Sequence, residues 1–136
     1  MADAMDTVQL SWYNNFPDGE LKPRKITEEE GMKLLFWSGE PEKSLPHKTQ
    51  ILLSQQGIHV GLIEMPPGRF GPPDTHPNGH EFFVCLEGKA TVLDGDNTFD
   101  LNPGEGGYCP PGTVHRLYNF TDKFCKVLFV IGGDMI

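Results

Sequence analysis

The sequence predicts an all-β domain built as a sandwich or barrel, and three observations support this prediction. Short runs of alternating apolar and polar residues recur from about residue 49 to the C-terminus, as in half-buried strands. Turn-forming residues, among 16 Gly and 12 Pro in the chain, separate these runs. One early stretch alone has helical spacing. Many short strands with a single early helix are typical of sandwiches and barrels.

The length of 136 residues suits one domain with a single hydrophobic core. We divide the chain into residues 1–46, an N-terminal arm with a short helix packed on the barrel, and residues 47–136, a single barrel. Trp12, Tyr13 and Phe16 lie in the arm, and we expect their rings to pack on this subunit or on a neighbour.

A short helix is predicted from Thr27 to Trp37. Thr27 and Glu30 have the Ser/Thr-x-x-Glu spacing of a capping box, which satisfies the first backbone N–H groups of a helix. Met32 and Phe36 then recur at a helical interval. The Gly and Pro residues that follow are expected to end this helix.

Strands are expected wherever an apolar run is bounded by turn residues. The segment Asp94 to Asn97 reads Asp-Gly-Asp-Asn, which predicts a hairpin turn between two of these strands. The predicted strands are 49–55, 58–65, 81–86, 89–93, 98–101, one that begins at Tyr108, 114–120 and 124–131.

The charge balance argues against a nucleic-acid partner. The formal net charge is −8 and no basic run occurs, so a phosphate backbone would be repelled. The N-terminus is acidic and lacks the basic and apolar regions of a signal peptide, and no apolar stretch is long enough to span a bilayer. We therefore expect a soluble, cytoplasmic protein that binds neither nucleic acid nor membrane.

The three cysteines are predicted to be reduced core thiols. Cys85, Cys109 and Cys125 are odd in number and too widely spaced for a zinc knuckle or a redox pair. Cys85 could instead face the interior pocket, where a thiol beside a redox metal would be open to oxidation.

Two segments carry side chains that suit a divalent metal. Asp74, His76, His80 and Glu81 lie between a Pro/Gly-rich turn and an apolar run, and His115 precedes another predicted strand. Imidazole and carboxylate together are ligands for borderline or hard divalent ions. We predict that the two segments close on one ion.

These segments resemble the two motifs of the cupin superfamily. The first motif is matched by Gly68, Asp74, His76, Glu81 and Gly88, with Asp74 standing where the first His usually is. The second is matched by Gly104, Pro110, Gly112, His115 and Asn119. The resemblance implies a double-stranded β-helix, or jelly-roll barrel, here with one short N-terminal helix.

The resemblance also implies a metal ion held inside the barrel by His76, Glu81 and His115. The strand period agrees with this assignment, because Glu81 shares one face of its strand with Phe83 and Cys85. Two imidazoles and one carboxylate leave positions open for substrate or dioxygen. Fe(II) is the favoured ion, and Zn(II), Mn(II) or Ni(II) are alternatives.

The role of Asp74 stays open at this point. It could be a fourth ligand, it could orient an imidazole, or it could be a turn residue that caps its own backbone. His80 is a rival fourth ligand, although its parity relative to Glu81 points it out of the barrel. A bulge at Asn78 and Gly79 would reverse that direction.

Further residues are predicted to contact the substrate. Phe83 and Leu117 would line an apolar pocket, or else form ordinary core. Asn119 shares the face of Leu117 and is counted with them, and Arg69 is a candidate anion clamp at the mouth. Glu81 and Asp74 are the candidate catalytic carboxylates.

We expect a metal-dependent enzyme for a small molecule. The first hypothesis is a non-haem Fe(II) dioxygenase acting on an aromatic or diketone-like oxygenated substrate. The second is a lyase, isomerase or polyketide-type cyclase in which Zn(II), Mn(II) or Ni(II) acts as a Lewis acid. The third is a ligand-binding cupin without catalysis.

The segment from Asp74 to Gly88 is similar to that of small cupin dioxygenases such as the 3-hydroxyanthranilate dioxygenases. Two departures mean that the same substrate is not implied: that family has a longer His-to-Glu spacing, and Pro72 occupies the place of its substrate-binding arginine. Family resemblance also suggests a homodimer. We expect the N-terminal arm and an edge strand near residues 49–55 to pair across its two-fold axis.

Overall fold

The structure is a computed structural model that describes residues 21–30, 32–36, 47–71 and 74–134. Within these residues the chain is all-β, with one short 3₁₀ turn, and the predicted fold class is confirmed. The elements are η1 (Glu28–Glu30), β1 (Met32–Phe36), β2 (His47–Gln55), β3 (Ile58–Met65), β4 (Gly79–Glu87), β5 (Ala90–Asp94), β6 (Asn97–Leu101), β7 (Gly106–Cys109), β8 (His115–Tyr118) and β9 (Cys125–Gly133).

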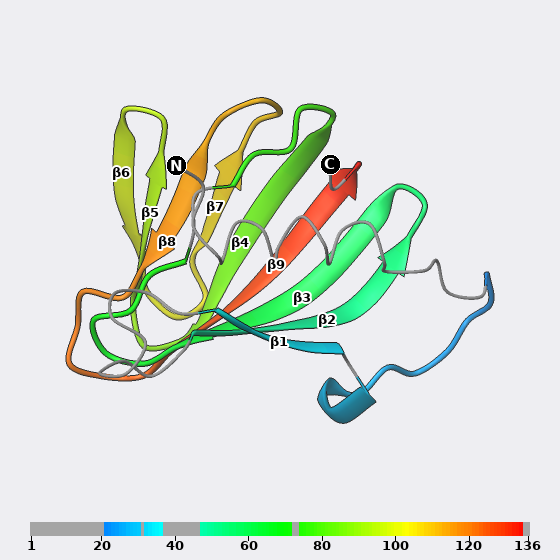
Figure 1. The fold of residues 1–136 in the computed structure, drawn as a ribbon, viewed down its shortest axis with the longest axis horizontal. Helices are drawn as coiled ribbons and strands as arrows, with labels where there is room; N and C mark the ends of the chain where they lie inside the picture. The colour runs from blue at the N-terminus through cyan, green and yellow to red at the C-terminus, as the bar shows by residue number, and fades with distance from the viewer. Residues whose placement is uncertain (1–20, 31, 37–46, 72–73, 135–136) are drawn as a thin grey trace.

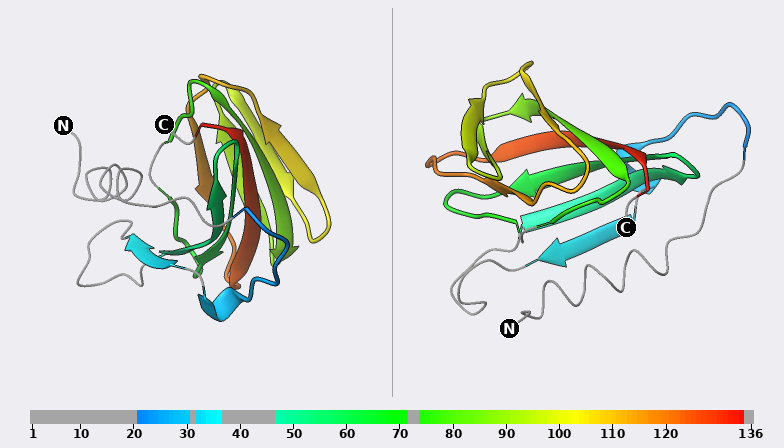
Figure 2. Two further views of the ribbon diagram at one scale, coloured as in Figure 1. Left: turned by 90° about the vertical axis from the view of Figure 1, so that its right-hand side faces the viewer. Right: turned by 90° about the horizontal axis from the view of Figure 1, so that it is seen from above.

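The strands form two antiparallel sheets. The larger has the order β1-β2-β3-β9-β4-β7, and the smaller has the order β6-β5-β8. In Figure 1 the small sheet lies at the left and β1 to β3 lie toward the right, and Figure 2 shows the same two sheets from the side and from above. Phe70 and Asp74 pair with Tyr118 and His115, which adds the segment before β4 to the edge of the small sheet.

The core lies between the inner faces of the two sheets. Along β4 and β9 every second residue is buried, which is the period of a strand with one face against a core. Phe83 on β4 pairs with Phe129 on β9, which in turn pairs with Gly61 on β3. A Cβ on Gly61 would lie 2.4 Å from the Phe129 ring, so that ring fills the space a side chain would need.

The inner face is apolar in its middle and polar toward one end. Glu81 is the next inward-facing residue of β4 after Phe83. It pairs with Ile131 on β9, and Ile131 pairs with His59 on β3. The His59 ring is hydrogen-bonded to Ser54 through Nδ1 at 2.7 Å. His59 therefore lies in the same row of the larger sheet as Glu81.

The predicted helix from Thr27 to Trp37 is wrong. Within the described residues the helical geometry is limited to Glu28–Glu30, and the apolar residues that follow form β1. β1 pairs with β2 in an unbroken antiparallel register from Met32–Ile51 to Phe36–His47. A short helix gains little once its nucleation cost is counted, so this long-range pairing outweighs the local capping box.

The predicted edge position of residues 49–55 is also wrong, because β2 lies between β1 and β3. Among the described strands, β1 and β7 are the edges of the larger sheet. Trp12, Tyr13 and Phe16 lie outside the described residues, and the homodimer stays a prediction. No helix in the described part of the chain is long and apolar enough to cross a membrane.

Candidate metal centre

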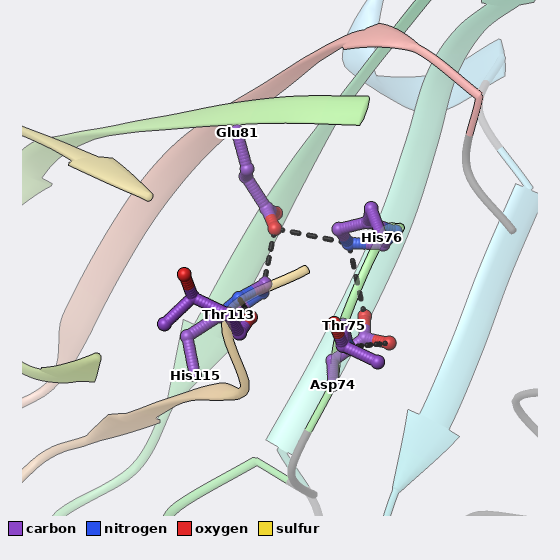
Figure 3. A network of polar contacts seen from close by, with 6 residues as sticks. All are labelled: Asp74, Thr75, His76, Glu81, Thr113 and His115. Carbon is purple, nitrogen blue, oxygen red and sulfur yellow. Dashed lines mark hydrogen bonds and ion pairs between the residues drawn. The ribbon is translucent and has the colours of Figure 1, made fainter. Parts of the chain in front are cut away.

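Four ionisable side chains meet at the polar end of the inner face, as Figure 3 shows. Glu81 reaches the site from β4, where its strand position faces inward and is buried. His115 is the first residue of β8, and Asp74 and His76 come from the segment between β3 and β4. Asp74 and His115 exchange two backbone hydrogen bonds of 2.9 Å, which aligns the two motif segments.

A third backbone hydrogen bond links the same segments. The amide of Gly112 donates to the carbonyl of His76 at 3.1 Å, and the amide of Gly79 donates to that same carbonyl at 3.2 Å. Gly112 has a φ of +81°, a conformation that side chains other than that of glycine adopt with strain. The glycine of the second motif thus shapes the turn that delivers His115 to the site.

The polar atoms of the four side chains lie at short distances from one another. Oε2 of Glu81 is 3.0 Å from Nε2 of His76 and 2.6 Å from Nε2 of His115. Oδ2 of Asp74 is 3.3 Å from Nε2 of His76. Asp74, His76 and His115 each offer one ligand atom, and these three atoms all lie within 4.8 Å of one another.

This arrangement suits a metal ion as well as direct contacts between the side chains. Oε2 of Glu81 is buried, and the Nε2 atoms of both His76 and His115 lie close to it. Two ligands bound at right angles to one ion, each about 2.1 Å from it, are about 3 Å apart, which is close to the spacing found here.

The electrostatics of the cluster match a site that holds either protons or a cation. Burial alone would lower the pKa of His76, but the Asp74 and Glu81 carboxylates outweigh it and raise that pKa to about 10. Burial opposes charge on His115 too, and Glu81 nevertheless raises its pKa. Burial would raise the pKa of Glu81, whereas the two imidazoles lower it. A divalent cation binding here would displace protons from the rings.

Backbone groups orient two of the four side chains. Nδ1 of His115 lies 3.3 Å from the carbonyl oxygen of Thr113, to which an Nδ1–H would donate, and this leaves Nε2 for an ion. The amide of Thr75 donates to Oδ1 of Asp74 at 2.9 Å. Oδ1 of Asp74 therefore accepts a hydrogen bond from the neighbouring backbone, as in a turn, while Oδ2 faces His76.

Of the residues predicted to contact substrate, two lie beside the cluster. Phe83 is 2 % exposed, and its ring packs edge-on against the His115 ring with centroids 5.7 Å apart. Leu117 is the next inward residue after His115 on β8 and is buried in the core. These two side chains form the apolar wall under the cluster.

The structure does not bring Asn119 to the cluster, and it places the backbone of Arg69 beside Asn119. The amide of Asn119 donates to the carbonyl of Arg69 at 2.8 Å. Nδ2 of Asn119 donates to the carbonyls of Met65 and Lys123 at 2.9 and 2.7 Å. Asn119 thus holds two backbone turns together at the far end of the small sheet.

His80 is directed away from the cluster, as its parity predicted. Its side chain is exposed on the outer face of β4, and its Nδ1 is hydrogen-bonded to the hydroxyl of Tyr108 at 2.6 Å. The three cysteines are free and buried, in agreement with the prediction of core thiols. The Cys85 thiol donates to the carbonyl of Glu87 at 3.5 Å.

One residue near the site escaped the sequence prediction. Asp94 pairs with His115 across β5 and β8, is 6 % exposed, and its Oδ1 has no hydrogen-bond donor among the described residues. Burial and the neighbouring Asp94 raise the pKa of the Cys109 thiol well above its usual range. Asp94 faces inward on β5, as Val92 does two residues earlier. The sequence prediction assigned Asp94 to a hairpin turn, and its inward direction was therefore not predicted.

Comparison with other proteins adds sequence relatives. Germin-like protein 3-1 of Oryza sativa subsp. japonica is 32 % identical over 84 residues, which cover 58 % of this chain and 35 % of that protein. Germin-like protein subfamily 1 member 1 of Arabidopsis thaliana is 33 % identical over 85 residues, covering 59 % and 39 %. The chain thus spans less than half the length of these relatives.

Solved structures share the fold. A protein described as a predicted oxalate decarboxylase from Thermotoga maritima superposes with a TM-score of 0.68 at 17 % identity, covering 80 % of this chain and 98 % of that one. A recombinant oxalate oxidase in complex with glycolate gives 0.53 at 19 % identity, covering 57 % and 42 %. The model of the cupin domain family matches residues 61–131, more than half of the chain and including all four clustered side chains. The chain therefore belongs to the cupin family.

Proposed function

We propose that the protein is a metal-dependent enzyme acting on a small oxygenated molecule, and that its reaction is an Fe(II)-dependent dioxygenation. The observation that carries this proposal is the convergence of two imidazole nitrogens on one buried carboxylate oxygen, at 2.6 and 3.0 Å. Two His and one carboxylate with open positions are the ligand pattern of non-haem Fe(II) oxygenases.

In this proposal His76, Glu81 and His115 hold the ion, and the bound iron supplies the redox chemistry with dioxygen that side chains lack. The buried Phe83 and Leu117 keep water from the inner side of the cluster. An aromatic or diketone-like substrate is the class we propose, because its oxygen atoms would suit the open positions of an ion held by the cluster.

A second candidate reaction uses the metal as a Lewis acid, with Zn(II), Mn(II) or Ni(II) polarising a substrate carbonyl. Asp74 favours this candidate, because its half-buried carboxylate lies 3.3 Å from His76 and could take a proton from a substrate carbon. A lyase, isomerase or cyclase would follow. A ligand-binding protein without catalysis is the third candidate.

The proposal is tested by metal analysis followed by assays under air and under argon. Protein loaded with Fe(II) is expected to consume dioxygen with catechol-like or diketone substrates in an oxygen electrode, and the His115→Ala variant is expected to be inactive. His80→Ala is the matched control, since His80 is an exposed imidazole outside the cluster.

Turnover under argon with Zn(II) or Mn(II) would instead support the Lewis-acid candidate. Protein that retains no metal after loading with any of these ions would overturn both enzymatic proposals and leave the ligand-binding candidate.

A further inference from the structure

We propose that Asp74 sets the metal preference of this site, so that the protein selects Mn(II) or Fe(II) over Zn(II) more strongly than a site with imidazole at this position would. The inference rests on the proposed function, since it concerns the same ion. It goes further by assigning to one residue the choice between metals.

Asp74 is held in a position from which it can reach the ion. Its backbone exchanges two hydrogen bonds with His115, and its Oδ1 accepts one from the amide of Thr75. These contacts leave Oδ2 at 3.3 Å from Nε2 of His76, and the Asp74 side chain is 22 % exposed. The carboxylate is thus oriented by the backbone and shielded from most of the solvent.

The chemistry of the donors then decides which ion is preferred. With Asp74 the cluster offers two imidazoles and two carboxylates, whereas the cupin motif carries a His where Asp74 stands. Imidazole suits Zn(II), Ni(II), Cu(II) and iron, and carboxylate oxygen suits harder ions such as Mn(II). Replacing a neutral nitrogen donor by an anionic oxygen donor therefore shifts the preference from Zn(II) toward Mn(II), while the remaining two imidazoles and one carboxylate keep the ligand pattern of Fe(II) sites.

The negative charge adds to the effect of donor type. A divalent ion among two carboxylates is neutralised, and a trivalent ion is stabilised more than it would be among three imidazoles and one carboxylate. The charge of Asp74 acts in a largely desolvated place, because His76 and Glu81 beside it are buried. Asp74 thus favours hard ions, and it also favours the oxidised form of a redox metal.

The test is a direct competition between Mn(II) and Zn(II) for metal-free protein, with bound metal counted by mass spectrometry. Three variants are compared with the wild type. Asp74→Asn removes the charge but keeps the oxygen that accepts from Thr75, so the loop geometry is preserved. Asp74→His restores the imidazole of the motif. Asp96→Asn removes an exposed carboxylate at the tip of the β5–β6 turn and serves as the matched control.

We expect Asp74→His to lower the ratio of bound Mn(II) to bound Zn(II) by about 10-fold or more, and Asp74→Asn to weaken Mn(II) binding by about 10-fold or more. Asp96→Asn should leave the ratio unchanged. The Mn(II) electron paramagnetic resonance spectrum should change in both Asp74 variants and stay constant in Asp96→Asn.

The inference is overturned, while the proposed function stands, under three joint results. The wild type binds metal, His115→Ala does not, and both Asp74 variants bind Mn(II) and Zn(II) in the same ratio as the wild type. If the wild type binds neither Mn(II), Fe(II) nor Zn(II), the proposed function and the inference fall together.

Discussion

The carboxylate of Glu81, on the larger sheet, lies 2.6 Å from Nε2 of His115, on the smaller sheet. Through this contact a polar side chain of one sheet meets a polar side chain of the other, and both residues are proposed ligands of the metal ion.

His115→Ala is expected to abolish metal retention, because it removes one of the two imidazole nitrogens that face Glu81. The measurement is the metal content per folded protein after gel filtration. His80→Ala should retain a full equivalent, since His80 is bonded to Tyr108 on the outer face. A full equivalent of metal in His115→Ala would remove His115 from the ligand set.

The stability of the metal-free protein is expected to depend on pH through His76. The Asp74 and Glu81 carboxylates raise the pKa of His76 from 6.5 to about 10 despite its burial, so the protonated ring stabilises the fold. This contribution is complete below pH 6.5 and is lost as the pH rises toward 10. The melting temperature should therefore fall across that range.

The acid side of the same profile is governed by Glu81. Its pKa is lowered from 4.5 by the two imidazoles, against the effect of burial, so its contribution is present above pH 4.5 and is lost as the pH falls below that value. Differential scanning fluorimetry of protein dialysed against a chelator measures the fall in melting temperature at both alkaline and acid pH. His76→Gln should flatten the alkaline limb, and a wild-type melting temperature that stays level from pH 7 to 10 would contradict the assignment.

Asp94→Asn is expected to raise the free energy of unfolding by about 1 kcal/mol. The side chain is buried and its Oδ1 has no donor among the described residues, and a buried acceptor without a donor costs free energy that an amide, which can also donate, would reduce. Urea unfolding measures the change, and Asp96→Asn, an exposed carboxylate two residues on, should differ from wild type by less than about 0.5 kcal/mol. A destabilised Asp94→Asn would mean that the charge has a favourable partner.

Asn119→Ala is expected to lower the free energy of unfolding by about 1–3 kcal/mol, because it removes the Nδ2 donor from the carbonyl of the buried Met65 and one of the donors to the carbonyl of Lys123. The metal content of the folded fraction should be unchanged. Urea unfolding combined with metal analysis checks both statements. Loss of metal without loss of stability would contradict the structural role given to Asn119 here.

Much of the barrel could be predicted from local patterns. The strand from Ile58 to Met65 has the same bounds in the sequence prediction and in the structure, since turn residues delimit it on both sides. This success depends on information that lies close together in the chain. The short distances from Glu81 to His76 and His115 agree with an expectation that came from the resemblance to the two cupin motifs, which lie far apart in the sequence.

The errors have a common physical origin in pairing that is distant in sequence. The residues of β1 have a helical pattern locally, and only the partner strand β2 makes them a strand. The alternation of residues along a strand correctly indicated that Leu117 and Asn119 share the face of His115. Alternation does not tell how far along the strand a residue lies from the site. Asn119 lies at the opposite end of that face, bonded to the turn at Met65.

The two backbone hydrogen bonds between Asp74 and His115 close a long loop of the chain and join the segment before β4 to the edge of the smaller sheet. The donor atoms consequently reach their final spacing only after that loop has closed, which is slow compared with hairpin formation. Because the proposed ligands come from both segments, an ion can bind all of them at once only in a chain in which this loop has closed.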